Sequence, residues 1–245
     1  FFCDFFIFQP YNSDDQIFYI DSNLTQTQDI ISKFNTYKLR AKIKIEDISN
    51  DYSFYSIIDG DQIISLFENE KNNLFTNCFI HQDPRFNELG KKIYVPINLN
   101  EKFLDYFSNY LCKDLYEMTR VQLGIPEGVN DIIPNKDFPL DFGYDQLNAI
   151  SFSKGCYIGQ EITARTHNRG KLKRKIFLVR ANKNLPDINA KIYYKYSKVG
   201  KMLSKFDSFG MALLDKNLTD ECINNNGFLE SNETKIIPST PSWYK

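Results

Sequence analysis

The chain has 245 residues and a formal net charge of −1, and 42% of its residues are hydrophobic and 25% charged. This composition is typical of a globular protein, and the length suits one large domain or two to three small ones. The small net charge provides no global attraction to nucleic acid or anionic lipid, and no apolar run is long enough to span a bilayer. We therefore expect neither nucleic acid nor a membrane as a partner.

The first half predicts alternating strands and helices. The apolar run at residues 1–8 is typical of a strand entered midway, so we expect an upstream portion to be missing from this sequence. A turn and a returning strand at residues 16–20 would complete a hairpin. Ser22 or Asn23 would then cap a helix with Ile30 and Phe34 on one face. Further strands are predicted at residues 43–48 and 54–58.

The longest predicted helix begins at Asn100, places Phe103, Phe107, Leu111 and Leu115 at steps of four, and ends by Gly124. Residues 124–150 follow as a long connection rich in Pro, Asp, Asn and Gly, a kind of segment that is often functional. After residue 170 only short β-like runs follow, at residues 175–179, 191–194, 199–203 and 209–214, with no helix. We predict two domains: residues 1–170, and an all-β barrel or sandwich at residues 171–245.

The cysteines predict a reducing compartment. They are odd in number, scattered, and without a Cys-x-x-Cys pair: Cys3, Cys78, Cys112, Cys156 and Cys222. With only two histidines in the chain, the sequence has no signature of a zinc site or a permanent Fe–S cluster, so we predict no permanently bound metal.

Residues 154–161, Lys-Gly-Cys-Tyr-Ile-Gly-Gln-Glu, carry the most specific chemistry in the chain. Cys156 follows Lys154 and Gly155, and it precedes a segment with helical spacing that should stop at Gly170. A helix N-terminus and a nearby ammonium group both favour the nucleophilic thiolate. A buried structural thiol in a glycine-rich turn is the alternative, since free cysteine is among the most buried residue types.

These eight residues and their flanks resemble the YgfZ family of folate-binding proteins, which is related to the T-protein aminomethyltransferase of glycine cleavage. The family hallmark is complete here in Lys154, Gly155, Cys156, Tyr157, Gly159, Gln160 and Glu161. Ordered matches flank it: residues 37–42 (Tyr-Lys-Leu-Arg-Ala-Lys), Asp83-Pro84-Arg85 with Gly90, residues 120–128, and Gly200-Lys201 with Ser204. They cover most of the chain to about residue 214, and residues 156–167 most resemble the mitochondrial and alphaproteobacterial branch.

The resemblance implies an α+β fold: an aminomethyltransferase-like, folate-binding ring of small domains, N-terminally truncated here, with a C-terminal all-β barrel. It implies a tetrahydrofolate-dependent factor that assembles or repairs [4Fe–4S] clusters. The partners would be folate and Fe–S client or scaffold proteins. We expect the bacterial cytoplasm as its location, with the mitochondrial matrix as the alternative.

The resemblance also names candidate residues beside the reactive thiol of Cys156. Folate-binding or motif roles are expected for the motif residues and for Arg165, Arg120, Gln122 and Asp4. Within the motif, Lys154 could steady a thiolate or a ligand carboxylate, or be a solvated lysine, and Gln160 could bond a pterin or cap the helix. Glu161 and Arg165, four residues apart, could simply form an ion pair on the helix.

A folate-dependent aminomethyl or one-carbon transferase is the rival function. The transferase has a paired Asp-Asp where this chain has Asp4-Phe5, and a pterin-contacting glutamate where it has Gln122. It also lacks the cysteine and the Gln-Glu of the motif. These departures favour an assembly factor over an enzyme with turnover, and a binding module with an inert thiol is the third possibility.

Overall fold

The computed structural model describes residues 2–9, 17–58, 60–70, 73–155, 159–170, 172–182 and 184–245, without the side chains of Ile162 and Arg169. The chain forms two compact units. We call Cys3–Asp83 with Asn87–Lys113 the N-terminal unit, and Asp114–Lys245 with Phe2 and Pro84–Phe86 the C-terminal unit.

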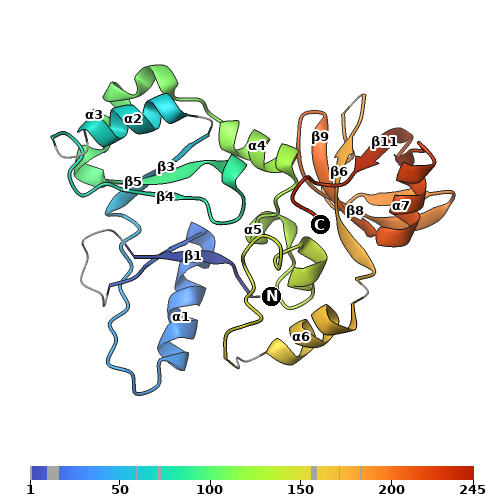
Figure 1. The fold of residues 1–245 in the computed structure, drawn as a ribbon, viewed down its shortest axis with the longest axis horizontal. Helices are drawn as coiled ribbons and strands as arrows, with labels where there is room; N and C mark the ends of the chain where they lie inside the picture. The colour runs from blue at the N-terminus through green and yellow to red at the C-terminus, as the bar shows by residue number, and fades with distance from the viewer. Residues whose placement is uncertain are drawn as a thin grey trace. The chain divides into compact units, whose positions relative to one another are not determined.

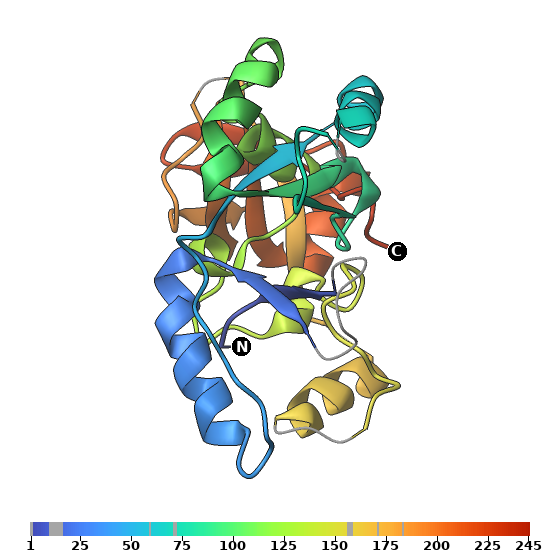
Figure 2. The same cartoon turned by 90° about the vertical axis from the view of Figure 1, so that its left-hand side faces the viewer.

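A hairpin and a helix open the N-terminal unit. Strand β1 (Phe5–Phe8) pairs antiparallel with β2 (Tyr19–Ser22), so the predicted hairpin is confirmed. Asn23 accepts a hydrogen bond from the backbone N–H of Thr25 and caps a short 3-10 turn, η1 (Leu24–Gln26), which leads into α1 (Thr27–Tyr37). The ring of Phe34 on α1 meets the ring of Phe5 edge-on, with centroids 5.7 Å apart, and so packs the helix against the hairpin (Figure 2).

The rest of the N-terminal unit is an antiparallel sheet in the order β3 (Tyr52–Ile57), β5 (Lys91–Pro96), β4 (Phe79–Gln82). Helices α2 (Asp61–Glu70) and α3 (Asn100–Tyr106) lie along this sheet in Figure 1. Their apolar side chains form its core with those of the sheet and its loops: Ile57, Phe67, Phe75, Cys78, Ile93, Val95, Phe103 and Phe107. Alternate residues of the strands face the hairpin instead.

Two predictions in this half are wrong. Residues 43–48 form no strand. The long helix predicted from Asn100 breaks into α3, a 3-10 turn η4 (Ser108–Tyr110), and α4 (Leu115–Leu123), with Asp114 at φ +67° before α4. Phe103 and Phe107 belong to the core of the N-terminal unit, whereas α4 belongs to the C-terminal unit. The helix breaks where the chain passes from one unit to the other.

The connection after α4 is packed tightly within the C-terminal unit. Gly124 ends α4 at φ +74°, as predicted, and the segment that follows contains α5 (Gly128–Asp131) and the 3-10 turn η5 (Pro139–Phe142). Its apolar side chains are buried: Ile125, Ile132, Leu140, Phe142 and Leu147. Trp243 packs over Gly143 and donates a hydrogen bond from Nε1 to the carbonyl of Leu123, at 2.8 Å.

Six strands close into a barrel in the order β10-β11-β6-β9-β8-β7, so the predicted C-terminal barrel is confirmed (Figure 1). The strands are β6 (Arg174–Arg180), β7 (Lys191–Tyr194), β8 (Ser197–Phe206), β9 (Phe209–Asp215), β10 (Leu229–Ser231) and β11 (Thr234–Ser239). A helix that we did not predict, α7 (Lys216–Asn224), connects β9 to β10 and buries Cys222 and Thr219. The side chain of Asp215 caps it by accepting from the N–H of Leu218 at 3.0 Å.

Candidate functional site

The predicted helix after the cysteine is present as α6 (Gln160–Arg169), and Gly170 ends it at φ +70°. Gly159 precedes it at φ +87°, a left-handed conformation that other residues adopt only with strain. Cys156 and Tyr157, with Ile158 between them and Gly159, lie outside the described residues. The helix therefore begins four residues after the cysteine in sequence.

An aromatic stack fixes the segment that leads into the motif. The ring of Phe152 lies flat against the imidazole of His167, with centroids 3.8 Å apart and an angle of 19° between the planes. His167 lies on α6, seven residues after Gln160, so the chain before the motif contacts the helix that follows the motif. Both ends of the cysteine-bearing segment are thereby held at one helix.

The described motif residues lie in the loop before α6 and on α6 itself. Lys154, Gly155, Glu161 and Arg165 are exposed, and Gln160 is half-buried. Glu161 and Arg165 both lie on α6. Among the ion pairs of the described residues, none joins these two side chains. The motif thus presents exposed polar groups of both charges on α6 and in the loop before it.

Arg120, predicted as a folate-binding or motif residue, is fully buried at the end of α4. Its Nε and one Nη bond the carboxylate of Glu117 at 2.9 and 2.5 Å, and its other contacts are the carboxylate of Asp131 at 3.0 Å, the carbonyl of Ile125 at 2.8 Å and the hydroxyl of Ser204 at 3.1 Å. A guanidinium has five N–H donors, so every donor is used. None is left for a ligand.

The same contacts fix the charge of Arg120. Burial alone lowers the pKa of the Arg120 guanidinium, but the hydrogen bonds to Glu117 and the charges of Asp131 and Glu117 outweigh burial and hold the pKa above its usual range. The carboxylate of Asp131 also accepts from the backbone N–H of Glu127 at 2.9 Å and of Ser204 at 2.8 Å. Arg120 and Asp131 therefore tie α4, α5 and β8 together. Sequence reasoning missed Asp131 because one aspartate in a polar connection carries no distinguishing pattern.

The other two candidate folate contacts lie in different units. Gln122 is exposed on α4, two residues after Arg120, so its amide is accessible to a ligand. Asp4 directly precedes β1 in the N-terminal unit. Beside it, the pKa of the Cys3 thiol is raised to about 11 by burial and by the charges of Asp4 and Asp29. Of these two candidates, Gln122 belongs to the same unit as the motif.

The described residues offer no metal centre and no membrane helix. Among them, no three His, Cys, Asp or Glu side chains gather as a metal site. Within the same residues, no helix has the length and apolar character needed to cross a bilayer.

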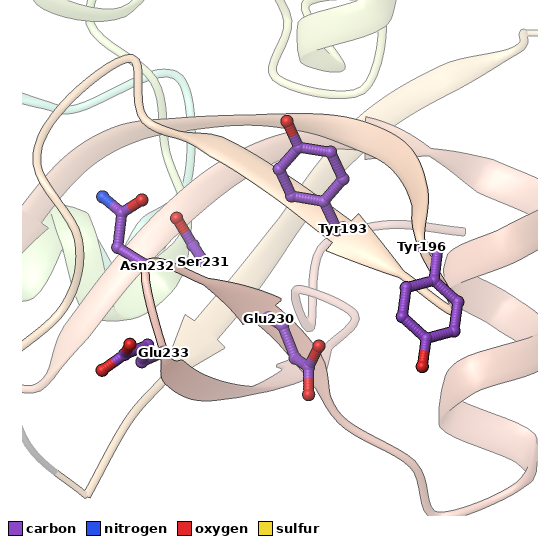
Figure 3. Close-up of a pocket in the computed structure, with 6 residues that line it drawn as sticks. All are labelled: Tyr193, Tyr196, Glu230, Ser231, Asn232 and Glu233. Atoms are coloured by element: carbon purple, nitrogen blue, oxygen red, sulfur yellow. The ribbon is translucent and has the colours of Figure 1, made fainter.

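A cavity of about 340 Å³ lies on the barrel (Figure 3). It is bordered by the β7–β8 turn, which carries Tyr196, and by the β10–β11 turn. Its lining is polar and acidic: Tyr193, Tyr196, Glu230, Ser231, Asn232 and Glu233. None of these lining residues is a candidate site residue from the sequence.

No family model matches the chain. Three curated relatives are named mitochondrial iron–sulfur cluster assembly factor IBA57 or its homologue. The Dictyostelium discoideum protein is 33% identical over 177 residues, which is 69% of this chain and 42% of the relative. The mouse protein is 34% identical over 138 residues (53% and 37%), and the human protein is 46% identical over 71 residues (29% and 20%). The matches span less than half the length of each of these relatives.

A solved structure shares the fold. The glycine cleavage system aminomethyltransferase T of Bartonella henselae superposes with a TM-score of 0.65 at 14% sequence identity, covering 92% of this chain and 67% of that one. The chain therefore has an aminomethyltransferase-like fold, while the relatives that share its sequence are named iron–sulfur cluster assembly factors.

Proposed function

We propose that this chain is part of an iron–sulfur cluster assembly factor that acts with tetrahydrofolate and uses the thiol of Cys156. The observation that carries the proposal is the 177-residue similarity to the Dictyostelium assembly factor, combined with the complete motif at residues 154–161. The names of the three relatives contain "mitochondrial", which supports the matrix alternative over the bacterial cytoplasm. Fe–S clients or scaffold proteins would be its partners.

The surroundings of the motif support a reactive thiol. Helix α6 starts at Gln160, and the positive end of a helix dipole at a helix N-terminus favours an anion nearby. Lys154 adds an exposed ammonium group two residues before Cys156 in sequence. The five cysteines of the chain are scattered in sequence, without a Cys-x-x-Cys pair, so we propose that the thiol acts transiently on a cluster, on sulfur or on a client.

The thiol proposal is tested by Cys156→Ala in the full-length protein, with a [4Fe–4S] enzyme assayed in cells that lack the gene. We expect enzyme activity to stay at the level of the deletion strain. Cys112→Ala is the matched control, because Cys112 is a free, exposed cysteine in the N-terminal unit. Full rescue by Cys156→Ala would exclude the thiol mechanism.

Folate binding is tested separately. Gln122 is the described candidate for holding the pterin, which would bring one-carbon chemistry to the site. We expect tetrahydrofolate to raise the melting temperature of the full-length protein, and Gln122→Ala to reduce that shift. Gln28→Ala, an exposed amide on α1, should leave the shift unchanged. An equal shift in wild type and Gln122→Ala would remove this residue from the site.

Aminomethyl transfer remains the second candidate, because the fold is that of an aminomethyltransferase. The sequence departures at Phe5, Gln122 and Cys156 oppose it. A direct assay decides: the full-length protein is incubated with tetrahydrofolate and an aminomethyl donor, and methylene transfer is measured. Transfer at a rate that depends on protein concentration would establish the transferase function in place of the assembly factor.

A further inference from the structure

The cavity on the barrel lies where two strands and two hairpin turns meet (Figure 3). Tyr193 on β7 and Glu230 on β10 lie directly opposite each other on neighbouring strands. Tyr196 belongs to the β7–β8 turn, and Glu233 belongs to the β10–β11 turn. Ligand pockets in proteins start at about 300 Å³, so a cavity of about 340 Å³ suits a group the size of one side chain.

The side chains that line this cavity have unused hydrogen-bonding capacity. Among the described residues, neither Glu230 nor Glu233 takes part in an ion pair or a side-chain hydrogen bond. Ser231 lines the cavity between them in sequence and is only 1% exposed. Its Oγ is buried and has no hydrogen-bond partner within the same residues. A buried hydroxyl without a partner costs free energy, which a donor group in the cavity would recover.

Lysines close to the cavity in sequence do not line it. Lys195 Nζ bonds the carboxylate of Glu221 at 2.7 Å, and Lys235 Nζ lies 4.3 Å from the centre of the Phe228 ring. Lys198, on β8, is likewise absent from the lining. The two carboxylates of the cavity are therefore not neutralised by an ion pair within the described part of the chain.

The two tyrosines add exposed aromatic surface beside the carboxylates. Tyr196 is fully exposed, and its φ of +68° lies in the left-handed region, where turns of this kind favour glycine or asparagine. The faces of aromatic rings attract organic cations, and arginine makes such contacts more often than lysine. No three His, Cys, Asp or Glu side chains gather among the described residues, so the lining favours an organic cation over a metal ion.

We propose that this cavity binds the guanidinium group of an arginine side chain on a partner polypeptide. A guanidinium has five N–H donors, no acceptor and a flat face, so it can bond the two carboxylates and the Ser231 hydroxyl while stacking on a tyrosine ring. Free arginine would bring its own carboxylate towards Glu230 and Glu233, which favours an arginine within a chain. This site is independent of the chemistry proposed for Cys156 and for folate.

An NMR titration of the full chain with N-acetyl-arginine amide, at neutral pH and low ionic strength, tests the ligand class. We expect saturable shifts of the backbone amides of residues 193–196 and 230–233. N-acetyl-citrulline amide has nearly the same shape without the charge and should bind about tenfold more weakly. Absence of saturable shifts, or equal affinity for these two probes, overturns the proposal. Equal affinity for N-acetyl-lysine amide overturns the choice of a guanidinium, and equal affinity for free arginine overturns the choice of a polypeptide.

A double substitution tests the role of the two carboxylates. Glu230→Gln combined with Glu233→Gln removes both charges with little change in shape, and we expect the affinity for N-acetyl-arginine amide to fall about tenfold. Asp207→Asn is the matched control, because Asp207 is an exposed carboxylate at φ +51° in the β8–β9 turn and does not line the cavity. Unchanged affinity in the double variant overturns the proposal. An equal loss in Asp207→Asn does so too, since it would show only a general attraction to negative charge.

Discussion

At the scale of single residues, the buried Arg120 shows how a charge can be structural in a segment that resembles a ligand-binding motif. Its five donors meet acceptors from Glu117, Asp131, Ser204 and one carbonyl. Removing one partner from a buried ion pair leaves an uncompensated charge, which is strongly destabilising. A substitution of Arg120 would therefore affect function by destabilising the fold of the C-terminal unit.

We expect Asp131→Asn to lower the free energy of unfolding by about 3 kcal/mol, because a buried guanidinium then loses its fully buried counter-charge. Urea unfolding followed by the fluorescence of Trp243 measures this change in the C-terminal unit. Gln122→Ala, an exposed change on the same helix, should stay within about 0.5 kcal/mol of wild type. Equal stability of Asp131→Asn and wild type would contradict the structural role.

Lys175 on β6 gives a second residue-scale prediction, on pH. Its side chain is 7% exposed, and Asp220 lies 3.6 Å from Nζ. Burial lowers the pKa of Lys175 from its usual value of 10.5, more than Asp220 raises it. The folded state therefore holds this proton less tightly than the unfolded state. Below the lowered pKa the cost of the buried charge is fully present, and it fades as the pH rises towards 10.5.

We expect Lys175→Met to stabilise the protein at pH 7 by about 1 kcal/mol, in the range found when buried charges give way to apolar groups. The gain should shrink as the pH approaches 10.5. Chemical unfolding at several pH values measures it, and Lys173→Met, an exposed change before β6, is the control. A gain that does not vary with pH would show that the charge is not responsible.

At the scale of elements, the two glycines that flank Cys156, Gly155 and Gly159, differ in their backbone conformation. A Cβ added at either position meets open space, but Gly159 alone of the two has a positive φ, +87°. Gly159 therefore sets the backbone at the start of α6, whereas the backbone at Gly155 allows a side chain.

We expect Gly159→Ala to cost about 1–2 kcal/mol of strain at the start of α6, the cost of a left-handed non-glycine residue. Gly155→Ala is the matched control and should leave stability unchanged. Melting temperatures of the two variants measure the difference. If both variants melt together with wild type, the left-handed turn does not constrain the helix start.

Local patterns predicted the elements that depend on local sequence. The hairpin, α6 with its stop at Gly170, and the barrel follow from alternation, helical spacing and turn residues. The helix from Asn100 failed because Leu111 and Leu115 continue the spacing while the chain changes units between them. Helix α7 was missed among strands, although Asp215 as cap and the spacing of Leu218 and Cys222 were available signals.

The sequence predicted which residues make up the motif and that a helix follows it, but it predicted only part of the contacts around them. The motif lies before a helix, as its spacing indicates, but no pattern in the sequence shows that Phe152 stacks on His167 or that Arg120 meets Ser204. Such contacts join positions that the fold alone brings together. The role of Cys156, the folate contacts and the domain boundary at residue 170 stay predictions.

At the scale of the whole molecule, the chain divides into two compact units that meet in sequence at Lys113 and Asp114. Residues 111–114 between η4 and α4 are exposed. Connections between compact units are the preferred sites of proteolytic cleavage.

We expect brief trypsin treatment to cleave after Lys113 and to leave a protected fragment that begins at Asp114. Because this fragment contains the barrel and Trp243, its fluorescence should still report a cooperative unfolding transition. Mass spectrometry identifies the cut, and Lys113→Gln should abolish it. Degradation without a protected intermediate would show that the two units fold only together.

The hydrogen bond between Arg120 and Ser204 has a kinetic consequence. It joins residues 84 positions apart in the chain, so a long loop must close before this bond can form, and we expect it to form late. Contacts made late on a folding pathway affect the unfolding rate more than the folding rate. The buried arginine would therefore act mainly on the lifetime of the folded C-terminal unit, which governs how long the motif loop persists between rounds of unfolding.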